Sequence, residues 1–244
     1  MATWLAHLRI AEQVYQQIEG LDQEMFYIGN IAPDSGLPDE HWESFTPSTE
    51  VTHFLASKAS LYYARDLAFF DQYLRGNPSP ELGKERFSFL LGYFFHLIID
   101  NLWSIHFDKP LREKYAKEFA VDPKFIWETK MDTYGLDHIF LRDHPQAAFW
   151  KVFVRAHYEN DCLEHLSAEA INHRIGYIKD YYQTETDEVR AMFKRPFIYL
   201  DKAGMDSIVE QFSNILVQVY QRIWVQKKPV EGHESILEML SDRN

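Results

Sequence analysis

The stretch GYFFHLIIDNLWSIH, which runs from Gly92 to His106, decides the fold because it is almost continuously apolar yet contains ionisable side chains. Together with the apolar residues just before it, this stretch would cover every side of a helix with apolar groups. A helix that is apolar on all sides is a buried helix. We therefore expect a central helix that begins at about Glu81 and is surrounded by the other helices of an all-α protein.

Two ionisable residues of this helix, His96 and Asp100, are four positions apart and therefore share one helical face. A carboxylate in apolar surroundings is costly unless it is paired, hydrogen-bonded or bound to a metal. An imidazole beside a carboxylate suits a divalent metal ion, although a hydrogen-bonded pair in the core is the ordinary alternative. His106 points away from Asp100 or lies beyond the helix end, so it would serve a neighbouring ion.

The composition is typical of one domain that spans residues 1–244. Aromatic residues make up 16% of the chain, which is enough for a sizeable core. The single cysteine, Cys162, excludes an internal disulfide framework and zinc sites built from several cysteines. The formal charge of −12 argues against broad binding to nucleic acid or anionic lipid. It does not exclude a small anionic substrate held by metal ions.

The N-terminal residues Met1–Ile10 lack the pattern of a signal peptide. No uncharged apolar run reaches the roughly 18 residues needed to span a bilayer. We therefore expect no transmembrane segment and a cytoplasmic location.

Periodicity predicts helices along most of the chain and hardly any strands. The expected helices cover residues 1–19, 50–75, about 81 onward, 110–117, 122–142, 147–161, 168–182, 202–226 and 233–240. The segment 21–47 contains several glycines and prolines and is expected to be a long loop, and 184–194 to be a link. The apolar stripe of helix 202–226 is expected in the core and would also suit a homodimer contact.

A set of polar residues in the first half occurs where a helix face is apolar or a loop is expected. Its members are His7, Asp34, His53, His96, Asp100 and His106. Each alone has an ordinary explanation, such as a core histidine, a turn residue or a partly exposed helix start. Together they offer nitrogen and oxygen ligands without thiolates, which suit zinc in a hydrolytic site. Clustered ions that share a carboxylate are typical of phosphate-ester hydrolysis.

The order and spacing of these residues resemble one known superfamily. His96-x3-Asp100-x5-His106 has the spacing of the zinc-dependent phospholipase C and single-strand nuclease superfamily. The segments Trp4-x2-His7, Ala32-Pro-Asp34 and Thr52-His53-Phe54 resemble its other motifs, in the same order. The resemblance covers residues 1–110 well and the rest loosely, and is closest to the small single-domain bacterial branch.

The resemblance implies a multi-helix bundle of the phospholipase C type, with a metal site buried between helices. One to three zinc ions would be bound. Asp34, His53, His96 and Asp100 would hold one of them, and Asp100 would bridge to another. His7 would hold that second ion, and His106 would serve the remaining one. Asp34 would also orient or deprotonate the attacking water, whose pKa the zinc ions would lower.

Two departures from the family pattern affect the ligand set. In secreted members the mature chain begins at the tryptophan, whose amino group helps to bind the ion shared with the histidine. Here Trp4 follows three residues, so the His7 ion lacks that anchor or has a different ligand. The family also has a His-x3-Glu or His-x3-Asp pair after the third histidine, and residues 107–150 contain none. Glu128, Asp132 and Asp137 are the nearest substitutes, and of these we expect Asp132 and Asp137 to be ligands.

These observations favour a zinc-dependent hydrolase that cleaves a phosphoester with metal-activated water. Its substrate would be a small phosphoester or a phospholipid head group, and nucleic acid is not expected. The incomplete ligand set leaves open a metal-binding helical protein of the same fold without hydrolytic activity. A purely structural helical domain, whose histidines are polar core residues, is the third alternative.

Overall fold

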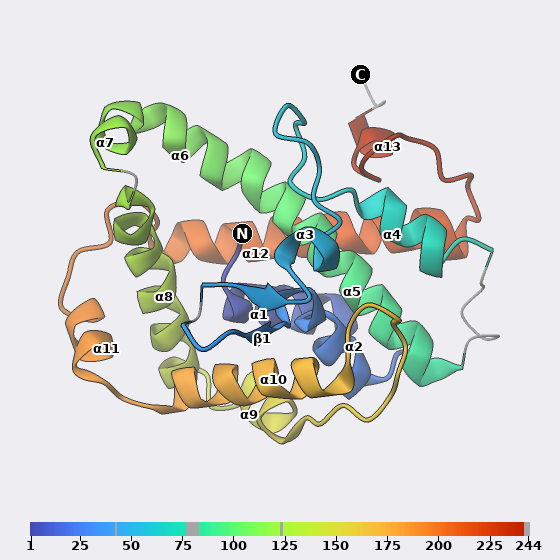
Figure 1. Cartoon of the computed structure of the whole chain (residues 1–244), viewed down its shortest axis with the longest axis horizontal. Coiled ribbons are helices and arrows are strands. Elements are labelled where there is room, and N and C mark those ends of the chain that lie inside the picture. Colours follow the sequence, from blue (N-terminus) through green and yellow to red (C-terminus); the bar gives the residue numbers. More distant parts are fainter. Residues whose placement is uncertain (42, 77–82, 123, 242–244) are drawn as a thin grey trace.

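The computed structural model describes residues 1–41, 43–76, 83–122 and 124–241. It confirms the all-α architecture (Figure 1). Within the described ranges, the only strands are β1 (Leu37–Pro38) and β2 (Phe45–Thr46), which form a two-stranded antiparallel pair. Figure 1 shows α1 near the middle of the molecule and α10 along one side.

The central helix is α5 (Lys84–Trp103), and every residue from Phe87 to Trp103 is buried in it. It continues through the π-helical turn η2 (Ser104–Asp108) into α6 (Lys109–Lys114). In the described part of the chain, this is the one helical stretch whose length and composition would allow it to cross a membrane. Within the fold, 89% of its most apolar window is buried, as in the core helix of a folded protein. The expected start near Glu81 lies outside the described residues.

Helix α2 (Gln23–Gly29) corrects the prediction of a continuous loop over residues 21–47. Asp22 caps it by accepting a hydrogen bond from the Met25 amide. The helix lies directly against α5. The two backbones can meet because Gly29 of α2 and Gly92 of α5 have no side chains. A Cβ atom on Gly92 would lie 2.3 Å from the Phe26 carbonyl oxygen. Gly92 therefore brings α2 against the central helix rather than leaving an open space.

The predicted helix over residues 50–75 is also wrong. The structure has a short helix α3 (Thr49–Thr52), an irregular segment, and helix α4 (Asp66–Tyr73). The Asn101 side chain holds the irregular segment by accepting from the Tyr63 and Ala64 amides and donating to the Ala64 carbonyl. These long-range hydrogen bonds replace those of a continuous helix.

The remaining elements are α1 (Trp4–Tyr15), η1 (Ala32–Asp34), α7 (Ala116–Val121), α8 (Phe125–Asp143), α9 (Ala148–Lys151), η3 (Phe153–Arg155), α10 (Ala168–Gln183), α11 (Asp187–Met192), α12 (Lys202–Tyr220), η4 (Gln221–Val225) and α13 (Glu238–Ser241). Helices α10 and α12 lie where periodicity predicts them. The expected helix over 147–161 is limited to α9 and η3, and the link 184–194 contains α11. The helix expected over 233–240 is limited to α13.

Candidate metal centre

Five ionisable side chains meet where α1, η1, α3 and α5 converge. His7 comes from α1, Asp34 from η1, His53 from the end of α3, and His96 and Asp100 from α5. We call these five residues the metal cluster. The three imidazoles and Asp100 are fully or almost fully buried, and the Asp34 side chain is 13% exposed. The two α5 residues share a face, as their spacing of four predicts.

Asp100 lies at the centre of the cluster. Its Oδ1 lies 3.4 Å from Nε2 of His7. Its Oδ2 lies 3.5 Å from Nε2 of His53 and 3.6 Å from Nε2 of His96. On the other side, Nε2 of His53 lies 3.4 Å from Oδ1 of Asp34. The three imidazoles therefore surround the Asp100 carboxylate, and His53 links it to Asp34.

The backbone fixes the orientation of His96. Its Nδ1 lies 2.8 Å from the Asn30 carbonyl oxygen, and because a carbonyl only accepts, Nδ1 donates the proton. Nε2 therefore faces the cluster, where it lies 3.2 Å from Nε2 of His53. A metal-binding histidine is usually oriented by such a hydrogen bond from its other ring nitrogen.

Several polar atoms of the cluster lack hydrogen bonds although they are buried. They are both ring nitrogens of His7 and Oδ2 of Asp100. Buried polar atoms in native proteins normally have partners, and a bound ion is one explanation for an exception. The ligand atoms form two groups, each within 4.8 Å: His7, His96 and Asp100 form one, and Asp34, His53 and His96 the other. Nitrogen and carboxylate oxygen in these numbers fit zinc.

The electrostatics of the cluster also suit a cation. Burial opposes the charge of Asp100, but the imidazoles of His7 and His96 hold the pKa of its carboxyl well below the usual value. The pKa of Asp34 is also lowered, because His53 and His96 outweigh the effect of burial. Burial and the charge of His96 lower the pKa of His7 to about 4. At neutral pH the carboxylates are thus ionised and His7 is neutral, as metal binding requires.

The residues before Trp4 lie beside the same carboxylate. The Ala2 amide donates to Oδ1 of Asp100 at 3.3 Å, and the Met1 amino group pairs with Asp108 at 2.9 Å. Trp4 itself lies on α1, and its ring makes edge contacts with Tyr177. The N-terminal segment therefore reaches the cluster through Ala2 rather than through the tryptophan.

The structure does not bring His106 to the cluster. His106 lies on the π-helical turn η2, is exposed, and has its ring 6.0 Å from that of Phe212. A π-helical turn shifts the register of the following residues relative to an α-helix. His106 therefore does not share a site with Asp100, although the two residues are six positions apart.

Asp132 and Asp137 are buried but lie apart from the cluster's groups of close ligand atoms. Asp132 accepts hydrogen bonds from the amides of Ile198 and Tyr199 at 2.7 and 2.6 Å, so it holds the segment before α12. Asp137 accepts from the Tyr182 hydroxyl at 2.7 Å, and burial raises its pKa to about 7. One oxygen of each carboxylate therefore has a partner within the scaffold, whereas Oδ1 of each has no hydrogen bond among the described residues.

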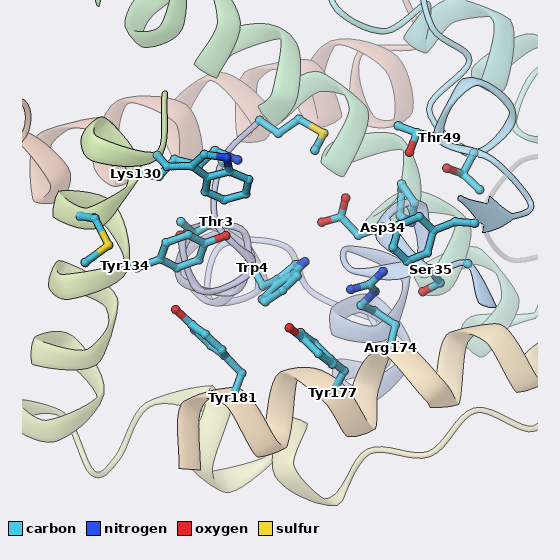
Figure 2. A pocket seen from close by; sticks show the side chains of 18 of the residues that line it. Thr3, Trp4, Asp34, Ser35, Thr49, Lys130, Tyr134, Arg174, Tyr177 and Tyr181 are labelled. Carbon is cyan, nitrogen blue, oxygen red and sulfur yellow. The ribbon is translucent and has the colours of Figure 1, made fainter. Parts of the chain in front are cut away.

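A cavity of about 690 Å³ opens beside the cluster. Asp34 is the member of the cluster that lines it, and Figure 2 shows its carboxylate among the side chains around this space. The opposite wall comes from α10, through Arg174, Tyr177 and Tyr181 (Figure 2). The sequence analysis singles out no residue of α10 and so missed this wall, although the spacing of three and four residues places the three side chains on one face.

The comparisons with known proteins agree with this geometry. A family model described as zinc dependent phospholipase C matches residues 6–192. This range contains the whole metal cluster and both α8 and α10. Neither the search of curated proteins nor the search of solved structures found a match.

Proposed function

Since the chain belongs to the zinc-dependent phospholipase C family, we propose that it is a zinc-dependent hydrolase that cleaves a phosphoester by attack of water. The observation that carries the proposal is the convergence of three imidazoles and Asp100 in a buried site. Two ring nitrogens of His7 and one oxygen of Asp100 have no hydrogen-bond partner there. A cation between these groups would bind one ring nitrogen of His7 and the Asp100 carboxylate.

The two groups of close ligand atoms suggest how zinc would be held. His7, His96 and Asp100 would hold one ion, and Asp34, His53 and His96 face the position of a second. Nε2 of His96 belongs to both groups but would bind only one ion, because Nδ1 donates its proton to the Asn30 carbonyl. Asp100 lies within 3.6 Å of all three imidazoles and would be available to either ion. When bound, zinc supplies a Lewis acid for the phosphate and lowers the pKa of water.

Asp34 would be the residue that acts on the attacking water. It is the one cluster member at the cavity wall, and its lowered pKa keeps it ionised at neutral pH. Oδ1 faces His53, which leaves Oδ2 to accept a hydrogen bond from water on the cavity side. Asp34 would orient this water and accept its proton as the bond to phosphorus forms.

The cavity limits the class of substrate. About 690 Å³ accommodates a small phosphoester or a phospholipid head group. The net charge of −12 does not favour the phosphate backbone of a nucleic acid. A small phosphodiester is therefore the substrate class that we propose.

The test is turnover of a 4-nitrophenyl phosphodiester by the full chain, before and after chelation and zinc addition. We expect hydrolysis that chelation abolishes and zinc restores. Bound zinc without turnover across several diesters would instead favour the metal-binding protein without hydrolysis. Asp132 and Asp137 do not belong to the cluster, so fewer ligands remain for further ions. This observation supports the second candidate, the metal-binding protein without hydrolysis.

A further inference from the structure

Arg174 on α10 is an unusual residue in the cavity wall. Its side chain is only 8% exposed, and its Nε has no hydrogen-bond partner. Among the described residues, no carboxylate forms an ion pair with it. A buried charge normally requires a partner, because its loss of hydration is otherwise uncompensated. Within the described part of the chain, this guanidinium therefore lacks a charged partner.

Aromatic rings hold the Arg174 guanidinium. Its central carbon lies 5.5 Å from the ring centroid of Trp4, and 5.6 Å from those of Phe45 and Tyr177. Rings attract a guanidinium through its charge and planar shape but accept few of its hydrogen bonds. The arrangement therefore positions the cation while leaving N–H donors for a ligand.

Arg174 faces the same cavity as Asp34. Both residues line it, and Figure 2 shows their side chains directed to a common space, with the tyrosine hydroxyls of Tyr134, Tyr177 and Tyr181 around it. Arg174 and Asp34 nevertheless form no ion pair, so the space between them is available to a ligand.

The other cations in the cavity wall have different surroundings. Arg195 lies 3.8 Å from Glu128 and 3.6 Å from Asp132, so two carboxylates balance its charge. The Lys130 amine lies 5.1 Å from the Trp127 ring centroid, and Trp127 is exposed. Among the described residues of this wall, Arg174 is therefore the cation that is buried without a carboxylate partner.

We propose that Arg174 binds a second anionic group of the substrate, a carboxylate or phosphate carried on the ester group beyond the scissile phosphate. The inference rests on the proposed function for the identity of the scissile bond. A guanidinium pairs with carboxylate or phosphate through two parallel hydrogen bonds. The scissile phosphate would lie at the metal cluster, and the ester group would extend across the cavity to α10. The enzyme would then select acidic phosphodiesters.

The test uses two substrates of equal size that differ in one charge. They are 4-nitrophenyl 3-carboxypropyl phosphate and its amide counterpart, 4-nitrophenyl 3-carbamoylpropyl phosphate. We expect the zinc-loaded wild-type chain to prefer the acid by roughly 10- to 100-fold in kcat/KM, the range for a charge-assisted pair. Arg174→Gln should abolish this preference and leave kcat/KM for the amide within about threefold.

Two further variants separate a binding role from a structural one. Arg174→Lys keeps the charge but not the planar pair of donors, so part of the preference should return. Lys130→Gln removes another cation of the same wall, and the preference should remain. If Arg174→Gln lowered kcat/KM equally for both substrates, the proposal would be overturned, because Arg174 would then act on the scissile phosphate or on folding. An unchanged preference would overturn it as well.

A binding measurement distinguishes failure of this inference from failure of the proposed function. Methyl 3-carboxypropyl phosphate and its carbamoyl counterpart, which have a poor leaving group, are titrated calorimetrically into zinc-loaded wild type and Arg174→Gln. Tighter binding of the acid that depends on Arg174 supports the inference even if no diester is cleaved. Turnover without any preference for the acid in either assay supports the function and contradicts the inference.

Discussion

The rings of His7 and His96 are stacked, with centroids 4.0 Å apart and planes 6° apart, although the two residues come from different helices. Each presents Nε2 to the Asp100 carboxylate, at 3.4 and 3.6 Å. Two stacked imidazoles cannot both carry a proton at low cost in a buried site, and the pKa of His7 is accordingly lowered to about 4. A cation shared at Asp100, as we propose, would account for both rings facing it.

Asp100→Asn should remove bound zinc and activity together. The neutral amide replaces a buried carboxylate that lies within 3.6 Å of three imidazoles, and a charged ligand is lost. Thermal stability should also fall, because metal binding to the folded state stabilises it. Zinc per chain, kcat and Tm are measured on the same preparation.

The matched control is Asp132→Asn, which alters another fully buried carboxylate. Asp132 holds the backbone of Ile198 and Tyr199, so its loss should lower Tm while zinc per chain stays the same. An Asp100→Asn variant that keeps its full zinc content would refute the assignment of Asp100 as a ligand.

Asp34→Asn should lower kcat by roughly 10²–10⁴-fold, the usual contribution of a general base. Asp34 is the cluster member at the cavity wall, and it is ionised at neutral pH. Turnover of the 4-nitrophenyl diester is measured on protein loaded to a known zinc content. Asp39→Asn, which changes an exposed carboxylate hydrogen-bonded within its own turn, should leave kcat unaffected. Normal turnover in Asp34→Asn would exclude Asp34 as the base.

Gly92→Ala should destabilise the fold by about 1–3 kcal/mol, the usual cost of overpacking a core. The added Cβ would lie 2.3 Å from the Phe26 carbonyl oxygen and force α2 away from α5. Gly176→Ala is the control within a helix, because a Cβ there meets no atom within 4 Å, and it should stabilise by up to about 1 kcal/mol. Urea unfolding measures both changes, and equal effects of the two variants would argue against the close helix contact.

The sequence predicts the parts of this fold that depend on local pattern. Uniform apolarity predicts the burial of α5, and the spacing of four predicts the shared face of His96 and Asp100. The break between α3 and α4 depends on hydrogen bonds from Asn101, 37 residues beyond Ala64. No periodicity within residues 50–75 encodes such a distant partner.

The same limit applies to the site. From the sequence, Asp132 is a plausible metal ligand. A buried carboxylate that accepts hydrogen bonds from backbone amides has the same local sequence pattern as one that binds a metal. Arg174 lies on a helix that reads as scaffold. Its importance becomes visible only when Trp4 and Phe45, which are remote in sequence, cover its guanidinium.

The pH dependence of stability should contain a contribution from Asp137. Burial raises the pKa of its carboxyl to about 7, above the value near 3.9 of an unfolded chain. Between these values the folded state holds a proton that the unfolded state has released, so this contribution to stability falls as the pH rises through the interval. The full effect is about 4 kcal/mol.

Asp137→Asn is neutral throughout this range and should remove the contribution. The free energy of unfolding of the wild type minus that of the variant should therefore decrease between about pH 4 and pH 8. Taking this difference cancels the titration of the metal cluster, which both proteins share. A difference that does not change with pH would show that Asp137 is already ionised in the folded protein.

The most direct test of the central claim, that the buried cluster around Asp100 is a metal centre, is the metal content of the full chain purified without chelator. Inductively coupled plasma mass spectrometry gives the identity and number of ions per chain. We predict stoichiometric zinc, with at least one ion per chain, since the cluster provides two groups of ligand atoms. A chain that carries no stoichiometric transition metal, and takes up none when zinc is added, would contradict the account.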